Sequence, residues 1–275
     1  MQFASSCASF YIEKLSSKYQ IDKIIMTGGA TKSYFCRMKW WDRAHMKPLY
    51  RIIQAAYLLT LRIFFKRGYY SGYSNIPSGK PVMLVCNHVN AFQDPIVLAS
   101  SSRRTFDWLV RVDLFVKGWV RFLLVSLNQL PIFRPRDGIR NMTKNQDTYD
   151  GVTRLLKRRA VVMIFAEGDC VPEKRLRPFK KGTARMAFSS AEQNGWDSDI
   201  HLIPAGVNYT QTEALRSEFM VSIGRAVPIM NYKKLYDESP AKAVNQLTSD
   251  LYEGVKENLV IVEHKETEAV CEGAL

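Results

Sequence analysis

A histidine and an aspartate lie close together in the chain, just after a predicted buried strand. The apolar run Val82–Cys86 is typical of such a strand and ends in Asn87-His88. Asp94-Pro95 follows six residues after His88 and opens a second apolar run. Histidine can accept a proton near neutral pH, and a carboxylate can fix its tautomer and stabilise the imidazolium. The spacing therefore predicts a general base, His88, oriented by Asp94.

A structural interpretation of the same residues is also open. Asp94 followed by Pro95 is favourable N-cap chemistry, with proline at the first helical position and the aspartate accepting backbone N–H bonds. His88 could then be an ordinary histidine at the end of a strand. These residues alone do not decide between the two interpretations, and three further segments bear on the choice.

The first of these segments, Leu130–Gly138, reads LPIFRPRDG and places Arg134 and Arg136 on a loop interrupted by prolines. A guanidinium is a rigid fork that can hold a phosphate or a carboxylate through two hydrogen bonds. We predict that both arginines bind substrate. The alternative is a solvated charged loop.

The second segment, Phe165–Cys170, follows another buried strand and places Glu167 beside Gly168, which permits close approach of a second group to the backbone. It leads into residues 174–181, which hold five cations in eight positions and end where a helix should begin. A helix N-terminus with Lys180 and Lys181 beside it is a candidate anion site. Taken alone, Glu167 could equally be a loop residue at the end of a strand.

The third segment, His201–Tyr209, is an apolar strand interrupted by Pro204. Proline lacks the N–H that a ladder requires, so it belongs at a sheet edge or a bulge. Structural and functional explanations of Pro204 are both open.

Composition limits the class of protein. The 275 residues are enough for one domain with a substantial core, and the formal charge of +13 calls for an anionic partner such as an acidic membrane surface, acidic small molecules or nucleic acid. The five cysteines form no CxxC pair and the four histidines show no ligand spacing, so we expect no metal site and no disulfide framework. A reducing compartment and the absence of a secretory signal are also expected.

The chain divides into four predicted parts. Residues 1–45 are predicted to be a poorly ordered extension, with Met46 a candidate start, and residues 261–275 a flexible tail. Residues 46–68 are predicted to form an amphipathic helix with a narrow cationic stripe, Arg51, Arg62 and Lys66, on a broad apolar surface. Such a helix suits a membrane interface, although a helix packed on the domain remains possible, and its uncharged run is too short to span a bilayer.

Residues 69–260 alternate apolar strands with helical patterns, which predicts an α/β fold with a mixed sheet flanked by helices. Side chains that follow the carboxyl ends of strands in such sheets tend to gather at one edge, so His88, Arg134 and Glu167 could converge. The expected strands are 82–86, 105–110, 131–133, 160–165, 201–207 and 219–224, and the expected helices are 95–101, 114–127, 141–159, 182–193 and 241–259.

The four segments, in this order, resemble the four blocks of the glycerolipid acyltransferases, the family of 1-acylglycerol-3-phosphate acyltransferase, over roughly residues 46–225. The resemblance implies that His88 is the base and Asp94 its orienter. It also implies that Arg134 of Ile132-Phe-Arg134 holds the acceptor's phosphate. Phe165-Ala-Glu167-Gly168 is similar to the third block, usually Phe-Pro-Glu-Gly-Thr-Arg, and Leu202-Ile-Pro204 to the fourth.

The chain departs from the family pattern at two places. One extra residue separates His88 from Asp94, and Asp169-Cys170 stands where the family has Thr-Arg, so a second phosphate-binding arginine is missing. Arg136, Lys174 or Arg175 could replace it. Otherwise the acceptor could lack the glycerol phosphate head, as with aminolipids.

The expected reaction is transfer of a fatty acyl group from acyl-CoA or acyl carrier protein to a lipid hydroxyl in phospholipid biosynthesis, with 1-acylglycerol-3-phosphate as the leading acceptor. The expected substrate-binding residues are Asn87, Arg134, Arg136, Glu167, Gly168, Lys180, Lys181 and Pro204. We expect no cofactor and no metal, because a thioester leaves readily, and a membrane-associated enzyme on the cytoplasmic face. Two other classes stay open: a basic nucleic-acid-binding protein, which lacks a recognised module here, and a thiol hydrolase using Cys86 or Cys170 with His88.

Overall fold

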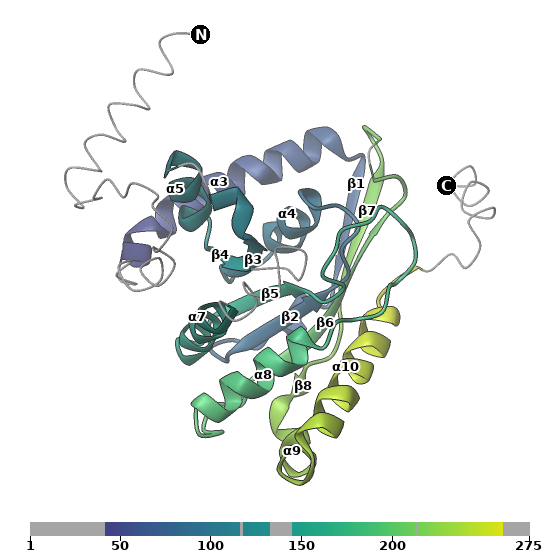
Figure 1. Ribbon diagram of the computed structural model, residues 1–275. Coiled ribbons are helices and arrows are strands. Elements are labelled where there is room, and N and C mark those ends of the chain that lie inside the picture. The colour runs from purple at the N-terminus through teal and green to yellow at the C-terminus, as the bar shows by residue number, and fades with distance from the viewer. Residues whose placement is uncertain (1–41, 116–117, 133–144, 213, 261–275) are drawn as a thin grey trace. The chain divides into compact units, whose positions relative to one another are not determined.

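The computed structural model describes residues 42–115, 118–132, 145–212 and 214–260. Eight strands form one mixed sheet in the order β1-β7-β6-β2-β5-β3-β4, with β8 also paired to β6 (Figure 1). The strands β6, β2, β5, β3 and β4 run parallel, whereas β7 and β8 run antiparallel to β6. The strand bounds are β1 Arg67–Ser71, β2 Val82–Cys86, β3 Phe106–Arg111, β4 Gln129–Ile132, β5 Val161–Phe165, β6 His201–Tyr209, β7 Glu218–Ile223 and β8 Val227–Pro228.

Helices cover both faces of this sheet. Figure 1 shows α7, α8 and α10 on one face and α3 and α4 on the other. The α-helices are α3 Asp42–Phe64, α4 Gln93–Ser100, α5 Gly118–Ser126, α7 Asn145–Lys157, α8 Gly182–Gln193, α9 Lys233–Glu238 and α10 Pro240–Lys256, and the 3-10 turns are Tyr73–Asn75, Val112–Phe115 and Ile229–Tyr232.

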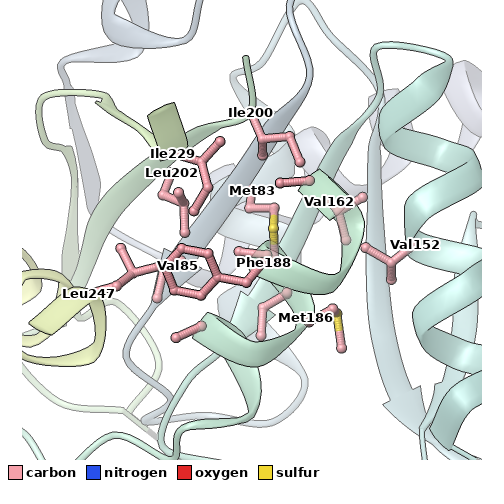
Figure 2. Close-up of a cluster of buried hydrophobic side chains, with 14 of the residues drawn as sticks. Met83, Val85, Val152, Val162, Met186, Phe188, Ile200, Leu202, Ile229 and Leu247 are labelled. Carbon is pink, nitrogen blue, oxygen red and sulfur yellow. The ribbon is translucent and has the colours of Figure 1, made fainter. Parts of the chain in front are cut away.

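The central strands are buried on both faces, as their continuous apolar sequences require. Along β2, Met83 and Val85 point toward α7, α8 and α10, whereas Leu84 and Cys86 point toward α3 and α4, because successive strand residues face opposite sides. Figure 2 shows the first of these cores, in which Phe188 of α8 packs among side chains from the strands. Burying a side chain of this size contributes roughly 1.5–3 kcal/mol. These contacts hold the carboxyl ends of β2, β5 and β6 together.

The helix α3 has one face on the protein and one face in solvent. Tyr50 and Leu61 are buried against the α4 side of the domain, while Ile52, Leu59 and Ile63 are 66%, 61% and 65% exposed. Packing on the domain and binding to a membrane interface are therefore compatible, because part of the apolar surface of the helix stays exposed after packing. None of the helices in the described residues is both long and apolar enough to cross a bilayer.

Several predicted elements differ from the structure. The expected helix 114–127 is divided into a 3-10 turn, Val112–Phe115, and α5, and β6 continues to Tyr209. The strand β1 was not expected, because its five residues are all exposed at the sheet edge and show no apolar alternation. The predicted extension was 1–45, but residues 42–45 belong to α3, and the rest of that extension lies outside the described residues. The predicted tail 261–275 and residues 133–144 also lie outside them.

Candidate active site

The side chains that follow β2 and β5 meet at one edge of the sheet. The two strands are parallel and in register, with Cys86 opposite Phe165, so His88 and Glu167 each lie two residues beyond the strand end. The backbone N–H of His88 donates a hydrogen bond of 2.8 Å to Glu167 Oε1. The expected convergence of His88 and Glu167 is therefore confirmed.

His88 and Asp94 form a buried pair. The His88 Nδ1 atom lies 2.9 Å from Asp94 Oδ2, and the aspartate is fully buried. A carboxylate oxygen accepts, so Nδ1 carries the proton of the neutral ring and Nε2 keeps its lone pair. One face of the imidazole ring is covered by Phe165, which stacks on it at a centroid distance of 4.0 Å. The predicted proximity is confirmed, and the ring presents one basic nitrogen for chemistry.

The extra residue between His88 and Asp94 is accommodated by a turn that encloses the carboxylate. We call residues 87–94 the dyad turn. Asp94 Oδ2 accepts the backbone N–H groups of Val89 and Asn90 at 2.8 and 2.9 Å. Asp94 is not the N-cap of α4, because the helix begins at Gln93 and the Asn90 Oδ1 atom accepts the Gln93 N–H at 3.0 Å. The structural interpretation of Asp94 as a helix N-cap is thus wrong. Its carboxylate instead accepts hydrogen bonds from the turn and from His88.

Tyr209 was missed by the sequence analysis. Its hydroxyl donates to Asp94 Oδ1 at 2.9 Å, from the last residue of β6. The expected strand ended at Val207, two residues too early. An aromatic residue two positions beyond an apolar strand was the available signal, but it did not indicate a partner.

Glu167 is occupied by the protein, not open toward a ligand. Its Oε1 atom accepts the His88 N–H, and its Oε2 atom lies 2.7 Å from Arg177 Nε. Burial raises the pKa of the carboxyl, while the bonds from His88 and Arg177 lower it. The substrate-binding role expected of Glu167 stays a prediction, because both of its carboxylate oxygens have partners within the protein. In the structure it holds the His88 backbone and places a guanidinium at the site.

Arg177 is a second residue that the sequence analysis missed. It also donates to the backbone carbonyl of Asp169, so its side chain folds back over the turn that begins at Ala166. The side chain keeps 27% of its surface exposed. We call residues 166–181 the cationic loop. Sequence could show that this loop is rich in cations, but not which of them reaches the strand ends.

The comparisons with known proteins agree with this geometry. A family model described as Acyltransferase matches residues 67–208, which include the strand ends, the dyad turn and the cationic loop.

The chain belongs to the acyltransferase family.

Two relatives are similar to this chain in sequence. An uncharacterized acyltransferase of Schizosaccharomyces pombe is 29% identical over 104 residues, which are 38% of this chain and 15% of that protein. Glycerol-3-phosphate O-acyltransferase 2 of Saccharomyces cerevisiae is 27% identical over 104 residues, or 38% of this chain and 14% of that protein. The match thus spans less than a sixth of either relative.

The fold is similar to that of the 1-acyl-sn-glycerophosphate acyltransferase PlsC from Thermotoga maritima. The crystal structure of PlsC aligns with a TM-score of 0.55 and 16% identity, covering 83% of this chain and 88% of PlsC. The predicted α/β class, a mixed sheet flanked by helices, is confirmed, as is the resemblance to the glycerolipid acyltransferases.

Gly168 lies against the side chain of Lys180. Gly168 has φ +75°, and a Cβ there would lie 2.8 Å from Lys180 Cδ. Lys180 Nζ pairs with Asp169 Oδ2 at 3.0 Å. The glycine therefore permits close approach, as expected, but of the lysine stem and not of a substrate.

Lys181 lies apart from the dyad. It precedes the first residue of α8 and lines a groove of about 430 Å³ between α7, α8 and α10 with Tyr149 and Arg185. The two lysines at the start of α8 were expected to act together on one anion, and the structure directs them to different surroundings.

Asn87 and Pro204 make structural contacts within the protein. The Asn87 amide exchanges two hydrogen bonds with the backbone of Val207, at 3.0 and 2.8 Å, and so extends the pairing of β2 with β6. The Pro204 ring lies on the sheet face that α10 covers. It approaches Gly254 of that helix so closely that a Cβ at this glycine would touch the ring. Substrate binding by these two side chains stays a prediction, and the contacts that the structure shows for them lie within the protein.

Pro204 lies inside the sheet but at a break in its pairing. β8 pairs with β6 at Leu202, and β7 pairs with it only from Ala205 onward. The Pro204 carbonyl accepts from Gly224 on that same side, so the missing N–H faces the break between β7 and β8. Pro204 therefore lies in a central strand and not at an edge, at a break between the two antiparallel partners of that strand.

Arg134 and Arg136 lie outside the described residues, so their substrate-binding roles remain predictions. Among the described residues, no group of three or more potential ligands could hold a metal ion.

The two thiols near His88 are not activated. Cys86 is buried, and burial raises its pKa well above the ordinary value. Burial also raises the pKa of Cys170 to about 11, and its thiol contacts the Val89 carbonyl at 3.3 Å. Both groups are protonated near pH 7, which argues against a thiol hydrolase because the thiolate is the nucleophile.

Proposed function

We propose that this protein is an O-acyltransferase that moves a fatty acyl group from a thioester to the hydroxyl of a glycerolipid acceptor. The single observation that carries the proposal is the buried His88–Asp94 pair, which fixes Nδ1 and leaves Nε2 as the reactive nitrogen. A lipid hydroxyl is barely ionised near pH 7, so a positioned base is the main chemical requirement.

The proposed reaction needs one proton carrier. The acceptor oxygen attacks the thioester carbonyl carbon while Nε2 of His88 takes the hydroxyl proton. The tetrahedral intermediate then collapses, the C–S bond breaks, and the departing thiolate receives that proton from the imidazolium. Asp94 stabilises the charged ring between the two steps, so the chemistry requires no metal and no covalent acyl-enzyme.

An anionic acceptor is the proposed substrate class. Arg177 and Lys180 bring two partly exposed cations to the edge where His88 lies, and the chain carries an overall formal charge of +13. The yeast relative is named for glycerol 3-phosphate and the structural neighbour for 1-acyl-sn-glycerophosphate, both of which carry a phosphate. We therefore propose 1-acylglycerol-3-phosphate as the leading acceptor, with an aminolipid as the alternative, and acyl-CoA or acyl carrier protein as donor.

Membrane association is proposed to use the outer face of α3. Ile52, Leu59 and Ile63 lie on one stripe of this helix and are exposed. Arg62 and Lys66 lie nearby and can face anionic lipid on the cytoplasmic side, whereas Arg51 donates to the Arg103 carbonyl within the protein. Nucleic acid is not an expected partner.

The membrane proposal is tested by sedimentation with vesicles that contain anionic lipid. Leu59→Glu should weaken binding about tenfold, because a charge replaces an inserted side chain. Thr60→Glu, one residue around the helix, is the matched control for charge. Equal binding by the two variants would show that the outer face of α3 does not contact the membrane.

The reaction is tested with full-length protein, labelled acyl-CoA or acyl carrier protein, and separate glycerol 3-phosphate, 1-acylglycerol-3-phosphate and aminolipid acceptors. The expected result is an ester product with a phosphate-bearing acceptor. If ester forms with the aminolipid alone, the acceptor is an aminolipid and not a phosphate-bearing glycerolipid. Hydrolysis of the thioester without ester product would overturn the transferase proposal.

A further inference from the structure

The two oxygens of Asp94 have different partners. Oδ2 accepts from His88 and from the backbone N–H groups of Val89 and Asn90, which are all within the dyad turn. Oδ1 accepts from the hydroxyl of Tyr209, which is 115 residues away in the chain. The dyad turn therefore holds one side of the carboxylate, and strand β6 holds the other.

The tyrosine hydroxyl is a fixed donor. Its ring stacks on Phe65 at a centroid distance of 5.9 Å, and its backbone pairs with Phe219 of β7. Burial raises the pKa of Tyr209 well above its ordinary value, and the charge of Asp94 raises it further, so the hydroxyl keeps its proton. Two residues earlier on β6, Val207 pairs with Asn87 at the start of the dyad turn. One strand end thus holds both ends of the turn.

We propose that Tyr209 is a positioning residue for acyl transfer, whose hydroxyl fixes the rotation and the charge of Asp94 and, through it, the His88 ring. This inference rests on the proposed function. Without the hydroxyl, Oδ1 would be a buried carboxylate oxygen that has lost its donor, and the carboxylate could turn about its Cβ–Cγ bond. Its negative charge would also be less stabilised, so the dyad would take up its inactivating proton at higher pH.

The other titratable and charged groups near Asp94 and Tyr209 keep the same charge when the Tyr209 hydroxyl is removed. Cys86 of β2, Cys170 and Glu167–Arg177 of the cationic loop, and Tyr70 of β1 interact electrostatically with Asp94 or Tyr209 or with their neighbours. Burial keeps the two cysteines protonated near pH 7, and the Glu167–Arg177 ion pair does not contact the Tyr209 hydroxyl.

The first experiment compares Tyr209→Phe with the wild type. We expect kcat to fall roughly ten- to a hundredfold, which corresponds to one charge-assisted hydrogen bond, while KM for both substrates stays the same. The acidic limb of the pH–rate profile should move to higher pH. Tyr232→Phe is the matched control, because it removes a tyrosine–aspartate bond of 2.6 Å, to Asp250, within the core of the opposite sheet face. Unchanged kcat, or a lower kcat with an unmoved acidic limb, would overturn the proposal.

A second variant covers the case in which Tyr209→Phe does not fold. Site-specific 3-fluorotyrosine at position 209 keeps the ring and strengthens the donor, because its hydroxyl is more acidic. The acidic limb should then move to lower pH, and an unmoved limb would overturn the proposal. The pH at which the NMR signals of the His88 ring change should move in the same directions in both variants. This readout does not depend on turnover, so it separates failure of this inference from failure of the proposed function.

Discussion

The dyad turn and the cationic loop leave neighbouring strands at the same sheet edge, but they are held in different ways. The dyad turn closes on one fully buried carboxylate, Asp94, with four donors around it. The cationic loop is held by two opposite-charge pairs, Glu167–Arg177 and Asp169–Lys180, whose basic partners keep part of their surface in solvent. A fully satisfied carboxylate fixes a reactive ring, whereas partly exposed pairs can exchange partners with an anionic ligand. The two regions should therefore respond differently to substitution.

Among the substitutions that compare the two regions, Asp94→Asn in the dyad turn is expected to have the largest effect. An amide cannot stabilise the imidazolium, and its NH2 group opposes the backbone N–H groups of Val89 and Asn90. We expect kcat to fall about a hundredfold to ten-thousandfold in steady-state assays. Asp113→Asn, on the exposed Val112–Phe115 turn, is the matched control. A loss of less than tenfold would mean that the buried carboxylate does not orient the base.

A smaller effect is expected for Glu167→Gln, where the two regions touch. The amide oxygen can still accept the His88 N–H, but the charge that pairs with Arg177 is lost. We expect kcat to fall about tenfold and the free energy of unfolding to fall by about 1–3 kcal/mol, measured by denaturant titration. Glu192→Gln on α8 should change neither. Full activity in Glu167→Gln would show that the cationic loop does not support the dyad.

Arg177→Gln separates the two possible roles of the cationic loop. If the guanidinium binds the acceptor's phosphate, KM for that acceptor should rise about tenfold while kcat changes less. Arg185→Gln, whose side chain lines the groove beside α8, is the control. A fall in kcat at constant KM, like that expected for Glu167→Gln, would instead make Arg177 a support for Glu167.

The smallest effect is expected for Cys170→Ala. Burial raises the pKa of this thiol to about 11, so less than one molecule in a thousand carries a thiolate near pH 7. Turnover should stay within about twofold of the wild type, because the thiol makes only weak hydrogen bonds, to the backbone of Val89 and Ala91. A loss above a hundredfold, with a trapped acyl-enzyme in the wild type, would restore the thiol mechanism.

The sequence was sufficient for elements whose patterns are strong. Val82–Cys86 and Gly182–Gln193 have the predicted bounds, since one is apolar throughout and the other carries its buried residues at helical spacing. The pairing of His88 with Asp94 was also predicted, from their residue types and their places after a strand and before a helix, and the turn between them brings the two side chains together. The exposed strand β1 and the short helix α9 have no such pattern and were missed.

The missed site residues depend on register between distant segments. Tyr209 reaches Asp94 only because β6 pairs with β2 and continues beyond Val207. Arg177 reaches Glu167 because its loop folds back over the strand end, which five cations in eight residues could not specify. Likewise, Glu167 was assigned to substrate because its backbone partner, His88, lies 79 residues away.

The most direct test of the account is acyl transfer by His88→Ala, using full-length protein on vesicles. The account predicts that turnover falls to the uncatalysed background, while circular dichroism and vesicle binding match the wild type. The alanine removes the base, its hydrogen bond to Asp94 and its stack on Phe165, but it leaves the hydrophobic cores on both sheet faces in place. His201→Ala, at the other end of β6, controls for loss of a histidine and should stay active. Turnover by folded His88→Ala close to that of the wild type would contradict the account.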